Sequence, residues 1–84
     1  MDILFAQRAW EDYLHWQAAD PTKLARINEL IRDISRQRFK GIGKPEPLRF
    51  GYAGYWSRRI DREHRLVYKV QGATVFIAQC RYHY

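Results

Sequence analysis

Three things are scarce in this sequence of 84 residues: cysteine, long apolar runs, and acidic residues in its second half. Cys80 is the single cysteine, which excludes an internal disulfide and is typical of a reducing compartment. No apolar run approaches the roughly 18 residues that a membrane-spanning helix requires. The first five residues lack the basic region and the cleavage site of a signal peptide. We therefore expect a cytoplasmic protein without membrane contact, folded as a single domain over residues 1–84.

The charge is divided unevenly along the chain. Residues 1–36 carry five Lys/Arg and six Asp/Glu, whereas residues 37–84 carry ten and three, a net charge of +7. A basic half joined to a nearly neutral half favours one surface that attracts a polyanion such as RNA. The alternative is that the arginines only form a solvated surface.

A short strand and two helices are expected first. Residues 2–5 are mostly apolar, and the spacing of Trp10, Tyr13 and Leu14 predicts a helix over residues 6–18. Asp20 can cap a second helix that starts at Pro21 and ends near residues 35–37. This second helix is expected to bury its apolar face: Leu24, Ile27, Leu30, Ile31 and Ile34.

The second half predicts a loop and then strands. Residues 38–47 contain two glycines and two prolines, which favours a fixed loop. Strands are expected near residues 47–50, 55–61, 64–70 and 73–82. Helices and strands segregated in this way predict an α+β domain, in which two helices cover one face of an antiparallel sheet. Four aromatic residues are expected in the core: Trp10, Tyr13, Trp16 and Tyr68. Three others are better candidates for contact with bases: Tyr52, Tyr55 and Tyr84.

Strand alternation predicts where the basic residues lie. Successive side chains of a strand point to opposite faces, provided that no β-bulge intervenes. In residues 73–82, alternation places Val75, Ile77 and Gln79 on one face with His83, and Cys80 on the other. If the apolar sets face the helices, the open face gathers five side chains: Arg59, Arg65, Lys69, Arg81 and His83.

Such a face suits a phosphodiester. Arginine binds phosphate oxygens in a fork, and histidine exchanges protons near neutral pH. Glu46, bracketed by Pro45 and Pro47, is a candidate base held in extended backbone. Taken singly, His83 could be an incidental surface residue and Glu46 a solvated one. A metal site is disfavoured, because His64, Cys80 and His83 lack the spacing of zinc ligands. No cofactor is expected.

Four linked motifs resemble the YoeB family of bacterial toxins, within the RelE superfamily. They begin at residues 43, 54, 63 and 80 and read Gly-Lys-Pro-Glu-Pro-Leu, Gly-Tyr-Trp-Ser-Arg-Arg-Ile, Glu-His-Arg-Leu-Val-Tyr and Cys-Arg-Tyr-His-Tyr. The resemblance covers the whole chain. It implies a RelE-like fold and a toxin that enters the ribosomal A site and cleaves translated mRNA without a metal. It also implies an acidic, YefM-like antitoxin as partner and a possible homodimer.

The resemblance further implies roles for individual residues. Glu46 would be the general base, His83 the general acid and Arg65 the stabiliser of the transition state, with Tyr84 assisting. Phosphate contacts would come from four more basic residues: Lys44, Arg49, Arg59 and Arg81. Arg49 stands where the family commonly has lysine, so it is expected to contact phosphate and not to transfer a proton.

Two other functions stay open. One is a non-enzymatic toxin of the gyrase-inhibiting ParE type, which shares the fold but lacks the Glu/Arg/His set. The other is a basic nucleic-acid-binding module, which would need neither a C-terminal histidine nor a bracketed glutamate.

Overall fold

The two predicted helices form where the capping residues place them. The structure, a computed structural model, describes residues 1–83. Helix α1 (Gln7–Ala19) is followed directly by α2 (Pro21–Arg36). Asp20 caps α2 by accepting a hydrogen bond from the backbone N–H of Thr22, and Pro21 occupies the first turn. The predicted apolar face of α2 is confirmed, with Ile27, Leu30 and Ile34 buried.

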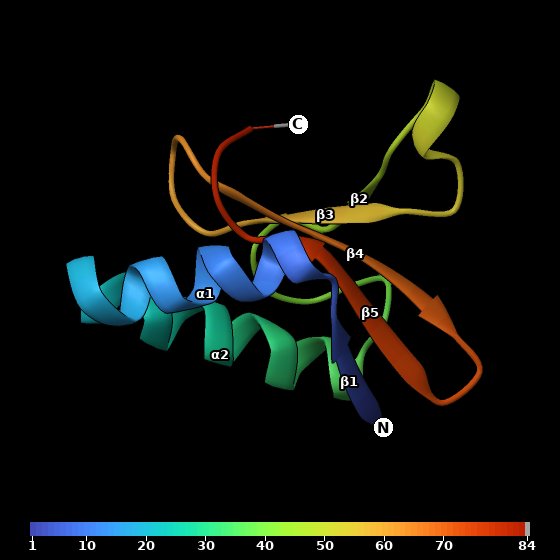
Figure 1. Ribbon diagram of the computed structural model, residues 1–84. Coiled ribbons are helices and arrows are strands. Elements are labelled where there is room, and N and C mark those ends of the chain that lie inside the picture. The colour runs from blue at the N-terminus through green and yellow to red at the C-terminus, as the bar shows by residue number, and fades with distance from the viewer. Residues whose placement is uncertain (84) are drawn as a thin grey trace.

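Five strands form one sheet in the order β1-β5-β4-β3-β2. They are β1 (Asp2–Phe5), β2 (Glu46–Pro47), β3 (Trp56–Arg59), β4 (Arg65–Gln71) and β5 (Thr74–Gln79). All neighbours are antiparallel except β1, which pairs with β5 in parallel and makes the sheet mixed. The two helices lie together on one side of the sheet (Figure 1). The predicted α+β class is confirmed.

The core lies between the helices and one face of the sheet. Its sheet side is formed mainly by four fully buried residues: Leu66, Tyr68, Val75 and Ile77. Trp16 of α1 packs on them, as predicted. The prediction that Trp10 lies in the core is wrong, since its side chain is 43% exposed. No helix among the described residues is long and apolar enough to span a membrane.

A β-bulge in β5 changes the predicted alternation. Val67 is opposite Gln79, but its neighbour Tyr68 is opposite Ile77, so Ala78 has no partner in β4. Val75 and Ile77 therefore face the core, whereas Gln79 lies on the open face with Val67. The prediction that these three residues share a face is wrong, while the core position of Cys80 is confirmed.

Two strand boundaries also differ from the prediction. The strand predicted at residues 47–50 is instead the two-residue β2, followed by a short 3₁₀ helix, η1 (Phe50–Tyr52). The last strand ends at Gln79 and not at residue 82. Beyond Gln79 the chain passes α1, where the carbonyl of Cys80 accepts from the indole N–H of Trp16, and it returns to the first residue of β4. In Figure 1 this segment rises above α1, on the side away from α2.

Candidate active site

Two arginines stand directly opposite each other on the open face. Arg59 of β3 and Arg65 of β4 are register partners. Like charges in this position destabilise a sheet, which favours a functional reason for keeping both. Arg65 is 9% exposed, and its Nε has no hydrogen-bond partner among the described residues. Within residues 1–83 neither arginine forms an ion pair. The pair therefore offers several N–H donors to an anion.

Glu46 lies at the edge of the same face. It is opposite Ser57 of β3, and Ser57 is opposite Val67 of β4. Because every second residue of a strand shares a face, Ser57 and Arg59 point to the same side as Glu46. The carboxylate is exposed to solvent. The preceding loop is fixed to the sheet, since the backbone N–H of Arg59 donates to the carbonyl of Gly43 at 2.7 Å.

A pocket extends from Glu46 to η1. It has a volume of about 540 Å³ and is lined by residues 46–52. Arg49 and Phe50 are both exposed, Phe50 to 94%. Lys44, on the loop before Glu46, is also exposed and has a left-handed φ of 51°. Two of the predicted phosphate contacts, Lys44 and Arg49, therefore lie within a few residues of Glu46 on either side.

The C-terminal segment returns to Arg65. The backbone N–H of Arg65 donates to the carbonyl of Tyr82 at 3.0 Å, and the N–H of Tyr82 donates to Nδ1 of His64 at 2.7 Å. His83 follows Tyr82 directly and is exposed. The candidate acid is thus attached to the backbone position that borders the arginine pair. Tyr84 lies outside the described residues.

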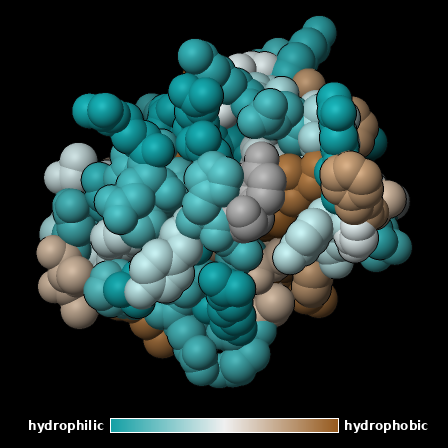
Figure 2. Space-filling model, turned by 90° about the horizontal axis from the view of Figure 1, so that it is seen from above, coloured by the Kyte–Doolittle hydropathy of each residue, from teal (hydrophilic) through white to brown (hydrophobic). Residues whose placement is uncertain are grey.

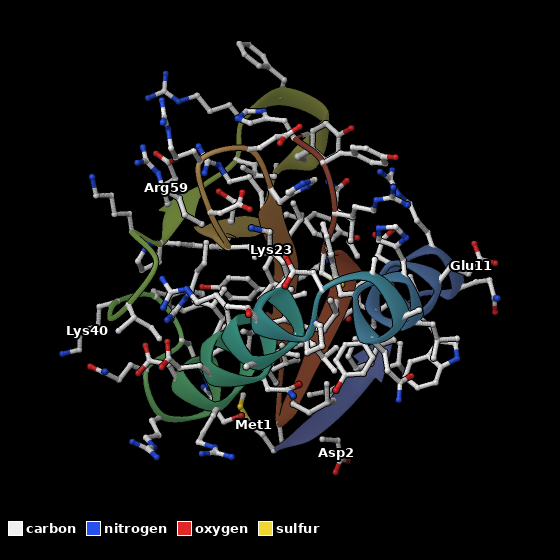
Figure 3. The ribbon with its side chains drawn as sticks, turned by 90° about the vertical axis from the view of Figure 1, so that its left-hand side faces the viewer. Met1, Asp2, Glu11, Lys23, Lys40 and Arg59 are labelled. Atoms are coloured by element: carbon white, nitrogen blue, oxygen red, sulfur yellow. The ribbon has the colours of Figure 1, made fainter. Side chains whose placement is uncertain are left out.

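The basic residues do not all gather at one point. Lys69 shares the open face with Arg65, and its Nζ lies 5.4 Å from the ring centre of Tyr55. Arg81 takes a different direction: its guanidinium lies over the rings of Tyr82 and Trp16, the latter a residue of α1. Figure 2 looks down on this side of the molecule and shows a mostly hydrophilic surface with an apolar area at one side. Figure 3 labels Arg59 on β3, whose carbonyl accepts a bond at 3.5 Å from the guanidinium of Arg26 of α2.

Arg58, which the sequence analysis did not single out, is a buried support for the site. It is 0% exposed and faces the helices. Its guanidinium donates to the carboxylate of Asp33 and to four backbone carbonyls, those of residues 37, 38, 40 and 42. These bonds hold the loop that leads to Glu46. Burial alone would raise the pKa of Asp33, but the bonds from Arg58 and from the N–H of Ile42 outweigh it and lower the pKa.

Cys80 is separated from this surface. It is 0% exposed, and burial, followed by the charge of Asp12, raises the pKa of its thiol to about 12. Within residues 1–83 no three His, Cys, Asp or Glu side chains are grouped as a metal site would require. Cys80 is therefore a core residue.

The fold and the site define a small basic α+β protein whose open sheet face carries a carboxylate, paired arginines and a histidine at its border. The family described as YoeB-like toxin of bacterial type II toxin–antitoxin systems matches residues 5–84. The toxin YoeB of Streptomyces coelicolor is 56% identical over 84 residues, and that of Escherichia coli K12 is 51% identical, each covering all of both chains. The chain belongs to this YoeB-like toxin family, which has the RelE/ParE fold.

Solved structures agree with this assignment. A YoeB/ParE toxin from Agrobacterium tumefaciens superposes with a TM-score of 0.98 at 48% identity, with both chains fully covered. A YoeB dimer from Staphylococcus aureus gives 0.95 at 47% identity, and a heterotetrameric YoeB–YefM complex from the same organism gives 0.94 at 47%. In both comparisons all of this chain and 98% of the other are covered.

Proposed function

We propose that this chain is a toxin that acts as a ribosome-dependent endoribonuclease and cleaves translated mRNA in the A site. One observation carries the proposal. Arg65 is opposite Arg59 in the sheet, and its backbone N–H is bonded to the residue that immediately precedes His83. Cations for a phosphate and a titratable imidazole therefore meet at one strand end, with Glu46 on the same face two strands away.

The chemistry follows from the substrate. Glu46 takes the proton of a ribose 2′-hydroxyl, and that oxygen attacks the adjacent phosphorus. The bond from phosphorus to the 5′-oxygen breaks, and His83 gives this oxygen a proton. The products are a 2′,3′-cyclic phosphate and a 5′-hydroxyl. RNA supplies its own nucleophile, so the mechanism includes no metal.

The arginines act on the charge that develops at phosphorus. Arg65, assisted by Arg59, stabilises the negatively charged transition state. A positioned acid or base contributes roughly 10²–10⁴-fold to such a rate, and a fixed donor at the oxyanion about 10²–10³-fold. Lys44, Arg49 and Arg81 contact phosphates, with Arg81 approaching from the side of α1. Tyr84 is proposed to assist on the resemblance alone.

The partners follow from the same charge. The basic open face is proposed to bind the ribosome and mRNA, and, when inhibited, an acidic segment of a YefM-like antitoxin in the cytoplasm. The Staphylococcus aureus relatives, solved as a dimer and as a YoeB–YefM heterotetramer, support a homodimer and such an antitoxin for this chain.

The decisive experiment is cleavage in a reconstituted translation system with mapped mRNA ends. His83→Gln and Glu46→Gln should each slow single-turnover cleavage by at least about 100-fold, while ribosome binding stays within about threefold of wild type. Arg32→Gln, on the exposed side of α2, is the matched control and should cleave like wild type.

Two outcomes would contradict the proposal. If wild type leaves mRNA intact but inhibits gyrase, the chain is a toxin of the ParE type. If it binds RNA and cleaves nothing, it is a binding module only.

A further inference from the structure

His64 is a buried histidine that the proposed reaction does not use. It lies in the turn between β3 and β4 and is 8% exposed. Its ring meets the edge of Trp16 at a centroid distance of 4.8 Å and lies 5.9 Å from the ring of Tyr82. It is therefore packed between α1 and the C-terminal segment.

The ring of His64 makes one short hydrogen bond, and it makes it as an acceptor. The backbone N–H of Tyr82 donates to Nδ1 at 2.7 Å. A ring nitrogen that accepts carries no proton, so this bond requires the tautomer of His64 with its proton on Nε2. An imidazolium has two donors and no acceptor, and it could not make this bond.

The turn itself is fastened to α2. Asp61 accepts hydrogen bonds from the backbone N–H groups of Glu63 and His64, at 2.8 and 2.7 Å. Lys23 of α2 forms an ion pair with the same carboxylate at 2.5 Å. Figure 3 shows Lys23 directed from α2 toward this turn. The imidazole of His64 is therefore carried by a turn whose backbone is fixed to α2.

Tyr82 is held on both sides. Its N–H is bonded to His64, and its carbonyl accepts from the N–H of Arg65 at 3.0 Å. Its φ is 67°, a left-handed conformation that residues with a side chain rarely adopt. Such a conformation persists only where the surroundings fix it. Two adjacent residues fix it here: His64 at the end of the turn and Arg65 at the start of β4.

We propose that His64 is a positioning residue for His83. By holding the N–H of Tyr82, neutral His64 fixes the backbone turn from which His83 departs, so that the imidazole of His83 is presented beside Arg65 and Arg59. This inference rests on the proposed ribonuclease function. A displacement of about 1 Å in a catalytic group can cost about 10²-fold in rate, so a loose Tyr82 would slow the reaction without touching the substrate.

Two variants distinguish the role of Nδ1 as a hydrogen-bond acceptor from the role of the His64 ring in packing. His64→Phe keeps a ring of similar size but offers no acceptor, whereas His64→Asn places a carbonyl oxygen close to the position of Nδ1. Both are compared with wild type by melting temperature, ribosome binding and single-turnover cleavage at saturating ribosomes. We expect His64→Phe to cleave about 10–100-fold more slowly at nearly unchanged ribosome affinity, and His64→Asn to cleave within about fivefold of wild type.

A second measurement does not depend on activity. Amide hydrogen exchange of Tyr82 should be at least about tenfold faster in His64→Phe than in wild type and should be restored in His64→Asn. Nitrogen NMR of the folded wild type should show an unprotonated Nδ1 at His64. Equal exchange in all three proteins, or a protonated Nδ1, would overturn the proposal whatever the cleavage rates are.

The cleavage assay also tells the two proposals apart. If wild type cleaves and His83→Gln does not, but folded His64→Phe matches wild type, the positioning role is wrong and the ribonuclease proposal stands. If both His64 variants lose activity in proportion to their melting temperatures, the role is structural only. If wild type does not cleave, the ribonuclease proposal fails, and the role of His64 toward His83 fails with it. This holds even if hydrogen exchange shows that His64 holds the N–H of Tyr82.

Discussion

The guanidinium of Arg58 and the carboxylate of Asp33 lie 2.6 Å apart and join the buried side of β3 to the last turns of α2. The same guanidinium bonds the carbonyls of Gln37 and Lys40, where α2 has ended and the loop toward Glu46 begins. One side chain of the sheet therefore sets both the end of a helix and the path of a loop that carries a site residue.

Arg58→Lys should lower the free energy of unfolding by about 3 kcal/mol, because an ammonium cannot reproduce the planar fork and leaves buried acceptors unpaired. Arg59→Lys is the matched control: this neighbour is exposed, so the change should stay within about 0.5 kcal/mol. Urea denaturation measures both. Equal and small decreases in the free energy of unfolding would mean that the guanidinium of Arg58 is not needed for stability.

Gly43→Ala should destabilise the protein by about 2–3 kcal/mol. Its φ is 80°, and an added Cβ would lie 2.8 Å from Leu30 Cδ2 and 3.1 Å from Arg58 Cβ. Gly72→Ala, at φ 56° with no atom within 4 Å, should cost only about 1 kcal/mol. Thermal unfolding measures both variants. At Gly43 it reports steric contacts together with backbone strain, and at Gly72 it reports backbone strain alone. A larger loss at Gly72 would contradict this account.

Asp61 should make stability depend on pH in the acid range. Burial would raise its pKa, but the hydrogen bonds from Lys23 and from the N–H groups of His64 and Glu63 lower the pKa to about 2. The unfolded value is about 3.9, so the stabilisation is complete above about pH 4 and is lost as the pH falls toward 2. Wild type should exceed Asp61→Asn by roughly 1–2 kcal/mol at pH 6, after allowance for solvent screening, and by almost nothing at pH 2. Urea titrations across this range provide the measurement; a constant difference would refute the assignment.

Cys80 should resist alkylation in the folded protein. Only the thiolate reacts, and the thiol has a pKa of about 12 and no exposed surface. Iodoacetamide at about pH 8 should modify native protein at least 100-fold more slowly than protein unfolded in urea. Mass spectrometry follows the rate. Native labelling within about tenfold of the unfolded rate would show that the core opens readily.

Association with an acidic antitoxin segment should slow by at least about tenfold as ionic strength rises from about 0.05 to 0.5 M. Arg59→Gln, on the open face, should reduce the association rate at low salt, whereas Arg32→Gln on α2 should not. Stopped-flow fluorescence resolves the rates. Equal effects of the two substitutions would indicate that net charge, and not the open face, attracts the partner.

Local chemistry was enough to predict the helices. The cap at Asp20, Pro21 in the first turn and the spacing of Ile27, Leu30 and Ile34 are contained within one stretch of chain, and all three are confirmed. The face of α1 was less predictable. Trp10 is exposed and stacks on Tyr13, and which side of a helix meets the sheet depends on how the whole layer is packed.

Features that need distant partners could not be predicted. A buried arginine at position 58 is stable only because a carboxylate and several carbonyls from α2 and its loop surround it. Likewise, His64 became a candidate only when the structure brought Tyr82 to its ring, 18 residues further along the chain. Glu46, Arg65 and His83 could be chosen from the motifs, and their roles remain predictions.

Ala78 has no partner in β4, and this extra residue shifts the inward and outward alternation of the β5 side chains by one position. Before it, odd-numbered residues point into the core; after it, Gln79 points out and Cys80 points in. If Ala78 were paired as a regular strand residue, alternation would turn the amide of Gln79 inward and the thiol of Cys80 outward; deleting Ala78 would remove the bulge and leave both side chains as they are. The bulge is therefore what lets a strand with an extra residue keep the thiol of Cys80 buried and the amide of Gln79 on the open face.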